Sequence, residues 1–593
     1  MTQILARLGE PGAGFKNLVS LYFFSKLLPK NGLELDSPPN APLEKPFGWK
    51  LLKPFASEPL NALSHDEANK TLAPDPMRSP QGWQCPIVTA KMMRMKIAII
   101  GSGISGLSAA WLLSEYSPHH ITIYEKNDYL GGHTHTIDYS APDGDKAHTI
   151  PVDTGFIVFN TITYPNLIRF FTLKGIAYQD SEMSFSVSRD NGRFEWAGTD
   201  LTTIFSQKSN LLRLGHWRML YDILKFNYCA PVMLTLQEGH PDRDLTLGEY
   251  LDREGYSKEF RDNYLLPMTA AIWSTPPDQC ATEFPVYTLI RFMHNHCLMQ
   301  ISHRPQWLTV CHGSRNYIQA LTSKVDEVRL ATPVKRVLRK GGKVVVLDEK
   351  GNDETYDQVV FASHADETLA LLGEDATPEE REILGSVKFS ENVAVVHCDE
   401  KLMPMRKSAW TSWNYLSQST ATSQYKNQVS LTYWMNNLQP FIPKEVPIFV
   451  TLNPLHPPKA SLTYATYRYT HPQYTSELIK AQAELPSIQG KYSVWFAGAW
   501  TGYGFHEDGF LSGVRVAQAM GASTPFRIYD NKEIRQVKEG LGGPSGDLAR
   551  MLFKALDVLG LCLAQVLGVF GIIPLLLMNH MRKPKLTLRS HSQ

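Results

Sequence analysis

The sequence predicts an α/β fold in which one three-layer domain is built from distant parts of the chain. Two glycine-rich segments support this prediction, residues 96–116 and 494–520, because each reads as a short apolar strand, a glycine turn and a helix. The third observation is Asp357 to Ala362, a short apolar strand between them. Strands of this kind are typical of parallel sheets covered on both faces. We therefore expect the three segments to share one sheet.

The first glycine-rich segment has the spacing of a nucleotide-binding turn. An apolar strand, Lys96 to Ile100, leads into a G-x-G-x-x-G, and a helix is expected from Ile104 to Tyr116. The glycines allow a sharp turn, close approach of a pyrophosphate and tight packing of helix on strand, and the helix N-terminus attracts the diphosphate. This pattern predicts a Rossmann-like unit, with a turn that holds no ligand as the alternative. The predicted contacts are Gly101, Ser102, Gly103, Ile104, Ser105 and Gly106.

The second predicted strand, Ile121 to Tyr124, ends on an acid that suits a ribose. The carboxylate of Glu125 can accept hydrogen bonds from a ribose diol and would repel a 2′-phosphate, which argues against NADP. Lys126 beside it is a further predicted cofactor contact. Gly131, Gly132 and His133 then resemble the G-G-R of flavoproteins of the glutathione-reductase and amine-oxidase type. Histidine in place of arginine makes that cation conditional on pH.

The second glycine-rich segment is expected to close a flavin site. Val494 to Ala497 reads as a strand, and Phe510 to Met520 as a helix whose N-terminus suits the pyrimidine end of an isoalloxazine ring. Ala499 stands where related sequences often carry an acid. One of His506, Glu507 and Asp508 contacts FAD or a bound water, or Asp508 is a simple helix cap. The predicted contacts here are Gly498, His506, Asp508 and Gly509.

Other candidate residues have two interpretations each. Arg329 to Asp348 turns at Gly341-Gly342, and backbone groups near Val334 either read the adenine ring or belong to a plain hairpin. Aromatic residues either wall the flavin or pack in the core, and two histidines, His364 and His397, are expected to be structural. The aromatic candidates are Trp500, Tyr503 and Phe505, and Gly155, Phe156 and Asn160 are placed near the flavin.

Longer motifs give the chain a family resemblance. They are DTGFIVFN (153–160), YPNL (164–167), AIWS (271–274), TYWMNNLQ (432–439), VTLNP (450–454) and GYGFHEDG (502–509). The chain resembles the flavin-containing amine oxidase superfamily, and more closely predicted FAD-binding oxidoreductases similar to the N-terminal half of plant cyclopropane-fatty-acid synthases. The resemblance implies an amine-oxidase-like FAD domain of two-dinucleotide-binding type with an inserted α+β substrate domain. It also implies bound FAD and a lipophilic substrate such as an acyl lipid.

Three functions follow as hypotheses, with no catalytic residue assigned, because the flavin itself accepts the hydride. The first is an FAD-dependent oxidoreductase that forms or shifts a double bond in a lipophilic substrate. The second is an amine oxidase that produces peroxide. In amine oxidases of this type a lysine often lies near the flavin, and no such lysine is identified in this chain. The third is a flavin-binding partner of a lipid-modifying methyltransferase.

Composition limits the other classes. The net charge of +1 gives no basic field for nucleic acid, and seven scattered cysteines without a C-x-x-C argue against a zinc or iron–sulfur site. Val558 to Met578 is apolar except for Gln565, and Arg582, Lys583 and Lys585 follow it. This run predicts a C-terminal membrane helix on a cytosol-facing protein. A buried helix, and a mitochondrial or soluble cytoplasmic protein, are the alternatives.

The expected domain order follows from these elements. A disordered extension precedes three FAD-binding parts, which alternate with a helical and a sheet-containing part of the substrate domain. The boundaries are 1–94 for the extension, 95–172, 304–372 and 490–525 for FAD binding, 173–303 and 373–489 for the substrate domain, and 526–593 for the tail.

Overall fold

The computed structural model describes residues 93–140, 149–300, 304–419, 429–530, 548 and 550–559 of the 593-residue chain. The chain divides into two units, Met1–Val88 and Thr89–Gln593, and every described residue belongs to the second. The predicted N-terminal extension lies outside the described residues except for its last two positions. Most of the candidate membrane helix, residues 560–578, lies outside them as well. Among the residues described, no helix has the length and apolar character needed to cross a bilayer.

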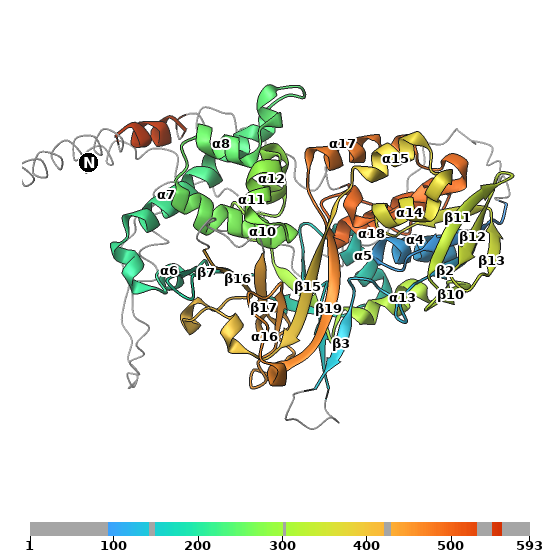
Figure 1. The fold of residues 1–593 in the computed structure, drawn as a ribbon, viewed down its shortest axis with the longest axis horizontal. Coiled ribbons are helices and arrows are strands. Elements are labelled where there is room, and N and C mark those ends of the chain that lie inside the picture. The colour runs from blue at the N-terminus through green and yellow to red at the C-terminus, as the bar shows by residue number, and fades with distance from the viewer. Residues whose placement is uncertain are drawn as a thin grey trace, which may run out of the picture. The chain divides into compact units, whose positions relative to one another are not determined.

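A five-stranded parallel sheet joins the three segments that the sequence predicted to share one sheet (Figure 1). Its order is β10 (Glu327–Arg329), β2 (His120–Tyr124), β1 (Lys96–Ile100), β14 (Gln358–Phe361) and β20 (Val494–Phe496). Ile97 pairs with both Ile121 and Gln358, and Val360 pairs with Trp495. The prediction of a sheet assembled from distant parts of the chain is therefore confirmed.

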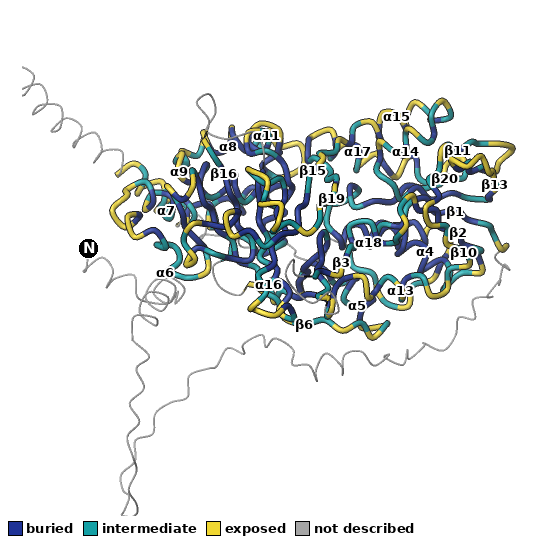
Figure 2. The backbone as a smooth tube through the Cα atoms, turned by 60° about the horizontal axis from the view of Figure 1, so that its bottom comes forward, coloured by how far each residue is buried: buried dark blue, intermediate teal, exposed yellow. Residues whose placement is uncertain are grey.

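The two faces of this sheet are covered by different layers. Ile97 and Ile99 face a core shared with helices α4 (Ile104–Tyr116), α13 (Ile318–Thr322) and α18 (His506–Ala519). Ala98 and Ile100 face a core shared with a three-stranded antiparallel sheet. That sheet consists of β11 (Val334–Lys340), β12 (Lys343–Asp348) and β13 (Asp353–Tyr356). Because successive side chains of β1 point to opposite faces, the parallel sheet lies between the helices and the antiparallel sheet, which gives the predicted three layers. Figure 2 shows β1 as a buried strand.

Helix α18 begins earlier than the sequence predicted. It starts at His506 rather than Phe510, so the three polar residues 506–508 form its first turn instead of the loop before it. Its glycines let it pack closely on α4: a Cβ on Gly513 would lie 2.0 Å from the carbonyl oxygen of Ser105, and one on Gly509 would lie 2.6 Å from Ile104 Cγ2.

A seven-stranded sheet forms the centre of the inserted part. Its order is β19 (Thr463–Pro472), β15 (Phe389–His397), β18 (Phe449–Leu452), β17 (Ser430–Trp434), β16 (Trp413–Ser417), β7 (Phe185–Arg189) and β8 (Phe194–Ala197). Residues 173–303 are mostly helical, as expected, but β7 and β8 form a hairpin within them that was not predicted and that joins this sheet. The hairpin turns at Asp190, Asn191 and Gly192, all with positive φ.

Helices follow this hairpin, as predicted. They are α6 (Leu201–Ile204), α7 (Leu214–Cys229), α8 (Leu247–Arg253), α9 (Lys258–Phe260), α10 (Leu266–Trp273), α11 (Pro277–Glu283) and α12 (Val286–Asn295). Helix α8 begins with a capping box, in which Thr246 and Glu249 each accept from the other's backbone N–H group.

The remaining strands and helices lie outside the parallel sheet and the seven-stranded sheet. The remaining strands are β3 (Thr136–Tyr139), β4 (Ile150–Asp153), β5 (Phe159–Asn160), β6 (Tyr178–Ser181) and β9 (Trp307–Val310). The remaining helices are α5 (Pro165–Lys174), α14 (Ala365–Leu372), α15 (Pro378–Gly385), α16 (Met435–Leu438) and α17 (Ser476–Glu484).

Candidate cofactor and substrate site

The glycine turn after β1 leaves space at one position and none at another. A Cβ on Gly103 would meet no heavy atom within 4 Å, whereas one on Gly106 would lie 2.0 Å from the carbonyl oxygen of Gly101. Gly103 is the N-cap of α4, and no side chain from the described part of the chain caps this helix. The first turn of α4 therefore presents its N–H groups toward an open space, as a diphosphate site requires.

The second pair of glycines lies directly against this turn. The N–H of Gly131 donates to the carbonyl oxygen of Ser102 over 3.0 Å. A Cβ on Gly132 would lie 3.2 Å from Gly103 Cα, and the φ of Gly132 is +58°. The structure thus brings together the two glycine motifs that the sequence assigned to one cofactor.

Glu125 is buried at the end of β2 and is already hydrogen-bonded. Its Oε2 accepts from the Ser102 N–H over 2.9 Å and from Ser102 Oγ over 2.6 Å, and Oε1 accepts from the Asn127 N–H over 2.9 Å. A carboxylate has about four acceptor positions, so capacity for a ribose hydroxyl remains. The backbone oxygen of Glu125 accepts from Thr332, which brings the chain leading to Val334 alongside. Lys126 instead forms an ion pair with Glu367 of α14 at 2.6 Å.

His133 is buried among aromatic and histidine rings. Its ring centroid lies 5.0 Å from that of Tyr469 and 5.4 Å from that of His471, both on β19. Burial lowers the pKa of His133 well below 6.5, and His471, His364 and His506 lower it further. The prediction of a pH-conditional cation is corrected accordingly, because the ring is neutral near pH 7. Its Nε2 is buried without a hydrogen-bond partner among the described residues.

These features together fit a dinucleotide cofactor. The space at Gly103, the uncapped start of α4 and the buried Nε2 of His133 have no partner among the described residues, and a bound diphosphate cofactor would supply one. Each of these positions was a predicted cofactor contact.

Two of the predicted polar residues in the first turn of α18, His506 and Asp508, make contacts within the protein. His506 stacks on Phe156 with centroids 3.8 Å apart and hydrogen-bonds the Tyr317 hydroxyl, and burial lowers the pKa of its imidazole to about 3. Asp508 Oδ2 accepts from the N–H of Phe505 over 3.0 Å, which is the contact of a helix cap. The sequence left both roles open for Asp508, and its bond to the Phe505 N–H is consistent with the cap.

Glu507 joins α18 to α5. Its two carboxyl oxygens accept from the N–H groups of Asn166 and Leu167 over 2.9 and 3.0 Å. Burial raises the pKa of Glu507 to about 8, although both hydrogen bonds favour the ionised form. The side chain therefore acts as an interior cap for α5.

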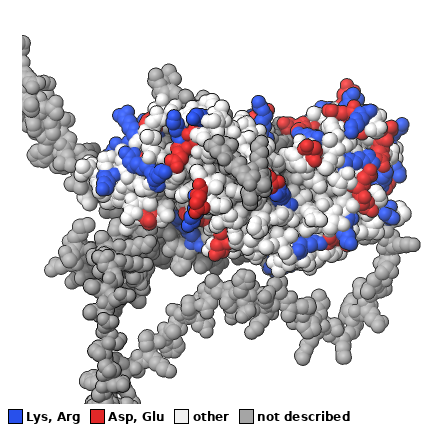
Figure 3. Space-filling model, turned by 90° about the horizontal axis from the view of Figure 1, so that it is seen from below, with Lys and Arg blue, Asp and Glu red and all other residues white. Residues whose placement is uncertain are grey.

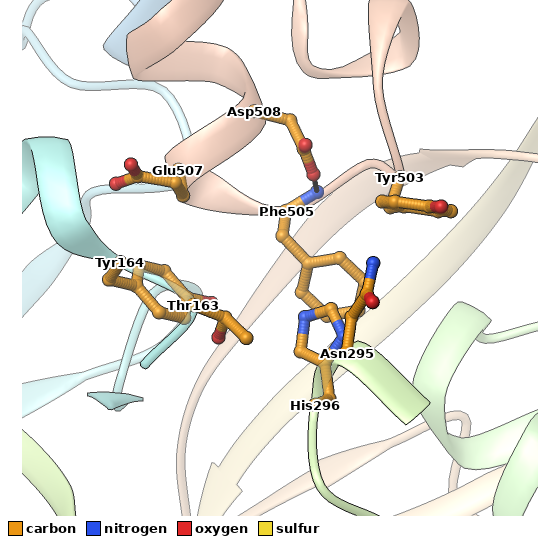
Figure 4. A pocket seen from close by; sticks show the side chains of 8 residues that line it. All are labelled: Thr163, Tyr164, Asn295, His296, Tyr503, Phe505, Glu507 and Asp508. Atoms are coloured by element: carbon orange, nitrogen blue, oxygen red, sulfur yellow. Dashed lines mark hydrogen bonds between the residues drawn. The ribbon is translucent and has the colours of Figure 1, made fainter. Parts of the chain in front are cut away.

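A pocket opens beside the start of α18 (Figure 4). The empty space between its lining residues, open solvent included, is about 320 Å³. The pocket is lined by Thr163, Tyr164, Asn295, His296, Tyr503, Phe505, Glu507 and Asp508. Sequence reasoning named Tyr503 and Phe505 as candidate walls but missed Asn295 and His296, which lie at the end of α12. The His-Asn-His triplet at 294–296 was the only local signal for them.

Asn295 and His296, at the end of α12, line this pocket with uncharged polar side chains. Asn295 is only 7% exposed, and no hydrogen bond joins its side-chain amide to the described residues. His296 Nδ1 lies 3.0 Å from the carbonyl oxygen of Phe292, so Nδ1 carries the proton and Nε2 is an acceptor. Burial lowers the pKa of His296 to about 4, which keeps the ring uncharged.

Several other candidates have structural contacts. Asn160 Oδ1 accepts from the N–H groups of Ile162 and Thr163, and Trp500 is buried in the core. His397 Nε2 bonds Thr451 Oγ1 over 2.7 Å, and His364 Nδ1 bonds Thr470 Oγ1 over 3.0 Å.

Two glycines among the candidates are fixed by close contacts with the chain. A Cβ on Gly155 would lie 2.3 Å from the oxygen of His133. A Cβ on Gly498 would lie 2.3 Å from Trp500 Nε1.

The glycine turns and the parallel sheet define a dinucleotide-binding α/β protein. Residues 104–439 match the family of flavin containing amine oxidoreductases, and the chain belongs to this family. The protein is therefore a flavin-dependent oxidoreductase with an amine-oxidase-like fold.

Curated relatives match part of the chain. A 15-cis-phytoene desaturase from an Oncidium hybrid cultivar is 24% identical over 302 residues, which cover 47% of this chain and 48% of the relative. A carotenoid phi-ring synthase from Streptomyces griseus is 23% identical over 312 residues, covering 50% and 56%. The chain spans about half the length of these relatives.

Solved structures share the fold. A putative protoporphyrinogen oxidase from Exiguobacterium sp. 255-15 has a TM-score of 0.51 at 16% identity, covering 72% of this chain and 99% of the other. A triple mutant of putrescine oxidase also has a TM-score of 0.51 at 16% identity, covering 72% and 98%.

Proposed function

We propose that the protein binds FAD and oxidises a lipophilic, uncharged substrate, with formation or shift of a carbon–carbon double bond. In such an enzyme the bound FAD supplies the hydride acceptor. The residues that would hold it are the turn from Gly101 to Gly106, Glu125, the Gly132-His133 pair and the start of α18. The dinucleotide-type turn favours FAD over a mononucleotide, because an adenosine half gives Glu125 a ribose to bind.

The pocket beside α18 carries the substrate proposal. Its lining contains no lysine or arginine, and His296 is neutral. Both of its carboxyl groups accept hydrogen bonds from backbone N–H groups. An ammonium substrate would lose its hydration in this buried pocket, which disfavours amine oxidation. The names of the two curated relatives refer to phytoene and carotenoids, and these apolar substrates support the same choice.

The residues of the chain have three tasks in this reaction. Tyr503 and Phe505 exclude water from the reacting bond, and the neutral amide of Asn295 orients the substrate by a hydrogen bond. His506 and Tyr317, which bond each other, fix the first turn of α18. None of these tasks requires a charged side chain.

The test is the absorption spectrum of the purified full-length protein, recorded before and after anaerobic addition of total lipid extract. We expect bands of oxidised flavin, the release of FAD on denaturation, and bleaching by lipid. Peroxide release on addition of amines, without bleaching by lipid, would instead support amine oxidation. A colourless protein that stays colourless with added FAD would refute the cofactor proposal.

Gly103→Val provides a sharp test of the cofactor site. A Cβ at this position meets no atom within 4 Å, so the fold is expected to persist while the valine occupies the space of the diphosphate. We expect at least a tenfold loss of bound flavin per protein, with an unchanged far-UV circular dichroism spectrum. Gly385→Val at the end of α15 is the matched control, because a Cβ there meets only Leu369 at 3.8 Å. Equal flavin content in both variants would contradict the assignment.

A further inference from the structure

Helix α7 turns an apolar stripe outward. Leu214, Trp217, Leu224 and Tyr228 recur at helical spacing and are exposed by 86, 46, 47 and 47%. Such spacing places them on one face of the helix. Leu211 and Leu212, just before the helix, extend the stripe and are exposed by 49 and 88%. Figure 2 shows α7 and its approach as one of the exposed regions of the fold.

The helical segment 550–559 lies along the same face of α7. The Tyr221 hydroxyl donates to the carbonyl oxygen of Phe553, and the two rings lie 5.6 Å apart. Asp557 pairs with Lys225 at 2.7 Å. This segment also presents apolar side chains to solvent, namely Met551, Leu552, Leu556, Val558 and Leu559, each at least 43% exposed. Two adjacent helices therefore expose one continuous apolar surface, which we call the α7 surface.

The charge around the α7 surface is positive. Residues 208–229 contain four lysines and arginines but one acid, Asp222, which bonds Arg218. Lys208, Arg213 and Lys554 are exposed. Figure 3 shows Lys and Arg side chains gathered at the end of the fold that carries α7. Exposed apolar side chains bordered by cations are the features of a surface that lies on an anionic bilayer.

The sequence that follows residues 550–559 is also consistent with binding to a lipid bilayer. The apolar run Val558 to Met578 begins at the end of the segment that packs on α7, and Arg582, Lys583 and Lys585 follow it. A soluble partner protein would not account for so long an apolar run.

We propose that the α7 surface docks the folded protein onto an anionic lipid bilayer, with Leu212, Leu214 and Trp217 inserted at the interface and Lys208 and Arg213 at the lipid headgroups. This proposal does not depend on the reaction proposed for the pocket. Docking here adds a second contact to any anchor formed by the C-terminal run, since single weak contacts bind bilayers only marginally.

The experiment measures co-sedimentation of the full-length protein with vesicles of phosphatidylcholine containing 30% phosphatidylserine. We expect Leu212→Glu/Leu214→Glu to weaken partitioning at least tenfold, and 0.5 M salt to weaken wild-type binding by screening the cations. The matched control is Leu173→Glu/Leu330→Glu, which places the same charges on leucines exposed by 46 and 40%, one on α5 and one after β10. Equal loss in both variants would overturn the proposal.

Hydrogen exchange separates this docking from anchoring by the C-terminal run alone. With the same vesicles, peptides covering 208–218 and 550–559 are expected to exchange more slowly, and the exposed turn at 349–353 is expected not to change. Bound protein without slowing at 208–218 would overturn the proposal. So would slowing at 208–218 without lipid that depends on protein concentration, which would show that the surface joins two copies of the chain.

Discussion

Glu507 shows how one buried acid can hold two distant segments and also make stability depend on pH. It lies on α18 but caps α5, and burial raises its pKa from 4.5 to about 8. The protonated form is therefore favoured in the folded state. The resulting stability is fully present below about pH 4.5 and is lost as pH rises through about 8.

Glu507→Gln tests this carboxyl group. An amide can accept from one of the two N–H groups of α5 but not from both, so the variant is expected to lose about 1–3 kcal/mol near pH 6. The difference from wild type should shrink toward pH 9, because only the wild type then ionises a buried group. Denaturant unfolding at pH 6, 7, 8 and 9 measures this trend.

Glu249→Gln is the control for this pH series. Glu249 also accepts from a backbone N–H, but its pKa is lowered from 4.5, so it stays ionised over this whole range. Its difference from wild type should be constant between pH 6 and 9. A constant difference for Glu507→Gln as well would contradict the raised pKa of Glu507.

His133 makes a second residue-scale prediction. The G-G-R motif that this segment resembles has arginine here, but the His133 side chain is buried beside His471 and Tyr469. His133→Arg would place an uncompensated charge in the interior of the apoprotein, at a cost of about 3–5 kcal/mol. Thermal unfolding of flavin-free protein measures this cost. His133→Gln, which keeps a neutral polar group, should be much less destabilising, and equal losses would argue against a neutral His133.

At the scale of elements, the contact between α4 and α18 is a prediction about glycine. A methyl group on Gly513 would lie 2.0 Å from the Ser105 oxygen and 2.3 Å from Ser108 Oγ. Gly513→Ala should therefore force the helices apart and cost about 1–3 kcal/mol or more. Gly385→Ala, where only Leu369 is near, should be close to neutral. Urea unfolding compares the two, and a neutral Gly513→Ala would contradict the packing.

Local pattern predicted the elements of the dinucleotide-binding part well and those of the inserted part less well. The strand from Lys96 and the helix to Tyr116 were predicted at their observed bounds, because glycine spacing and apolar periodicity act over a few residues. The β7–β8 hairpin was missed, although Asn191-Gly192 is a strong turn signal. The start of α18 was predicted four residues late, at Phe510, because residues 506–508 were assigned to the glycine-rich turn before the helix.

The pocket could not be predicted from local sequence. Asn295 comes from α12, Thr163 precedes α5 and Phe505 precedes α18. These residues come together only through tertiary packing, so no short-range sequence pattern predicts that they share a pocket. The same holds for the burial of His133, which is produced by β19, a strand far along the chain.

At the scale of the whole molecule, the interleaved segments predict cooperative unfolding. The parallel sheet and the helices around it come from all three dinucleotide-binding segments, so a ligand held by one segment should stabilise the others. Removing the flavin should lower stability by about 2.7 kcal/mol when free FAD had been at 100 times its Kd. Thermal scans followed by near-UV and far-UV circular dichroism should shift together, and a shift in one signal alone would contradict this coupling.

The order of strands in the parallel sheet also has a consequence for synthesis of the protein. Asp357, whose carboxylate accepts from the N–H of Lys96 at the start of β1, is 261 residues further along the chain. At about 5–20 residues per second, the ribosome needs roughly 13–50 s to supply that neighbour, and longer still for β20 and α18. During this interval the newly made, apolar β1 lacks half of its final surroundings. A nascent chain of this kind is expected to require a chaperone on the ribosome, and it cannot acquire its flavin until translation is nearly finished.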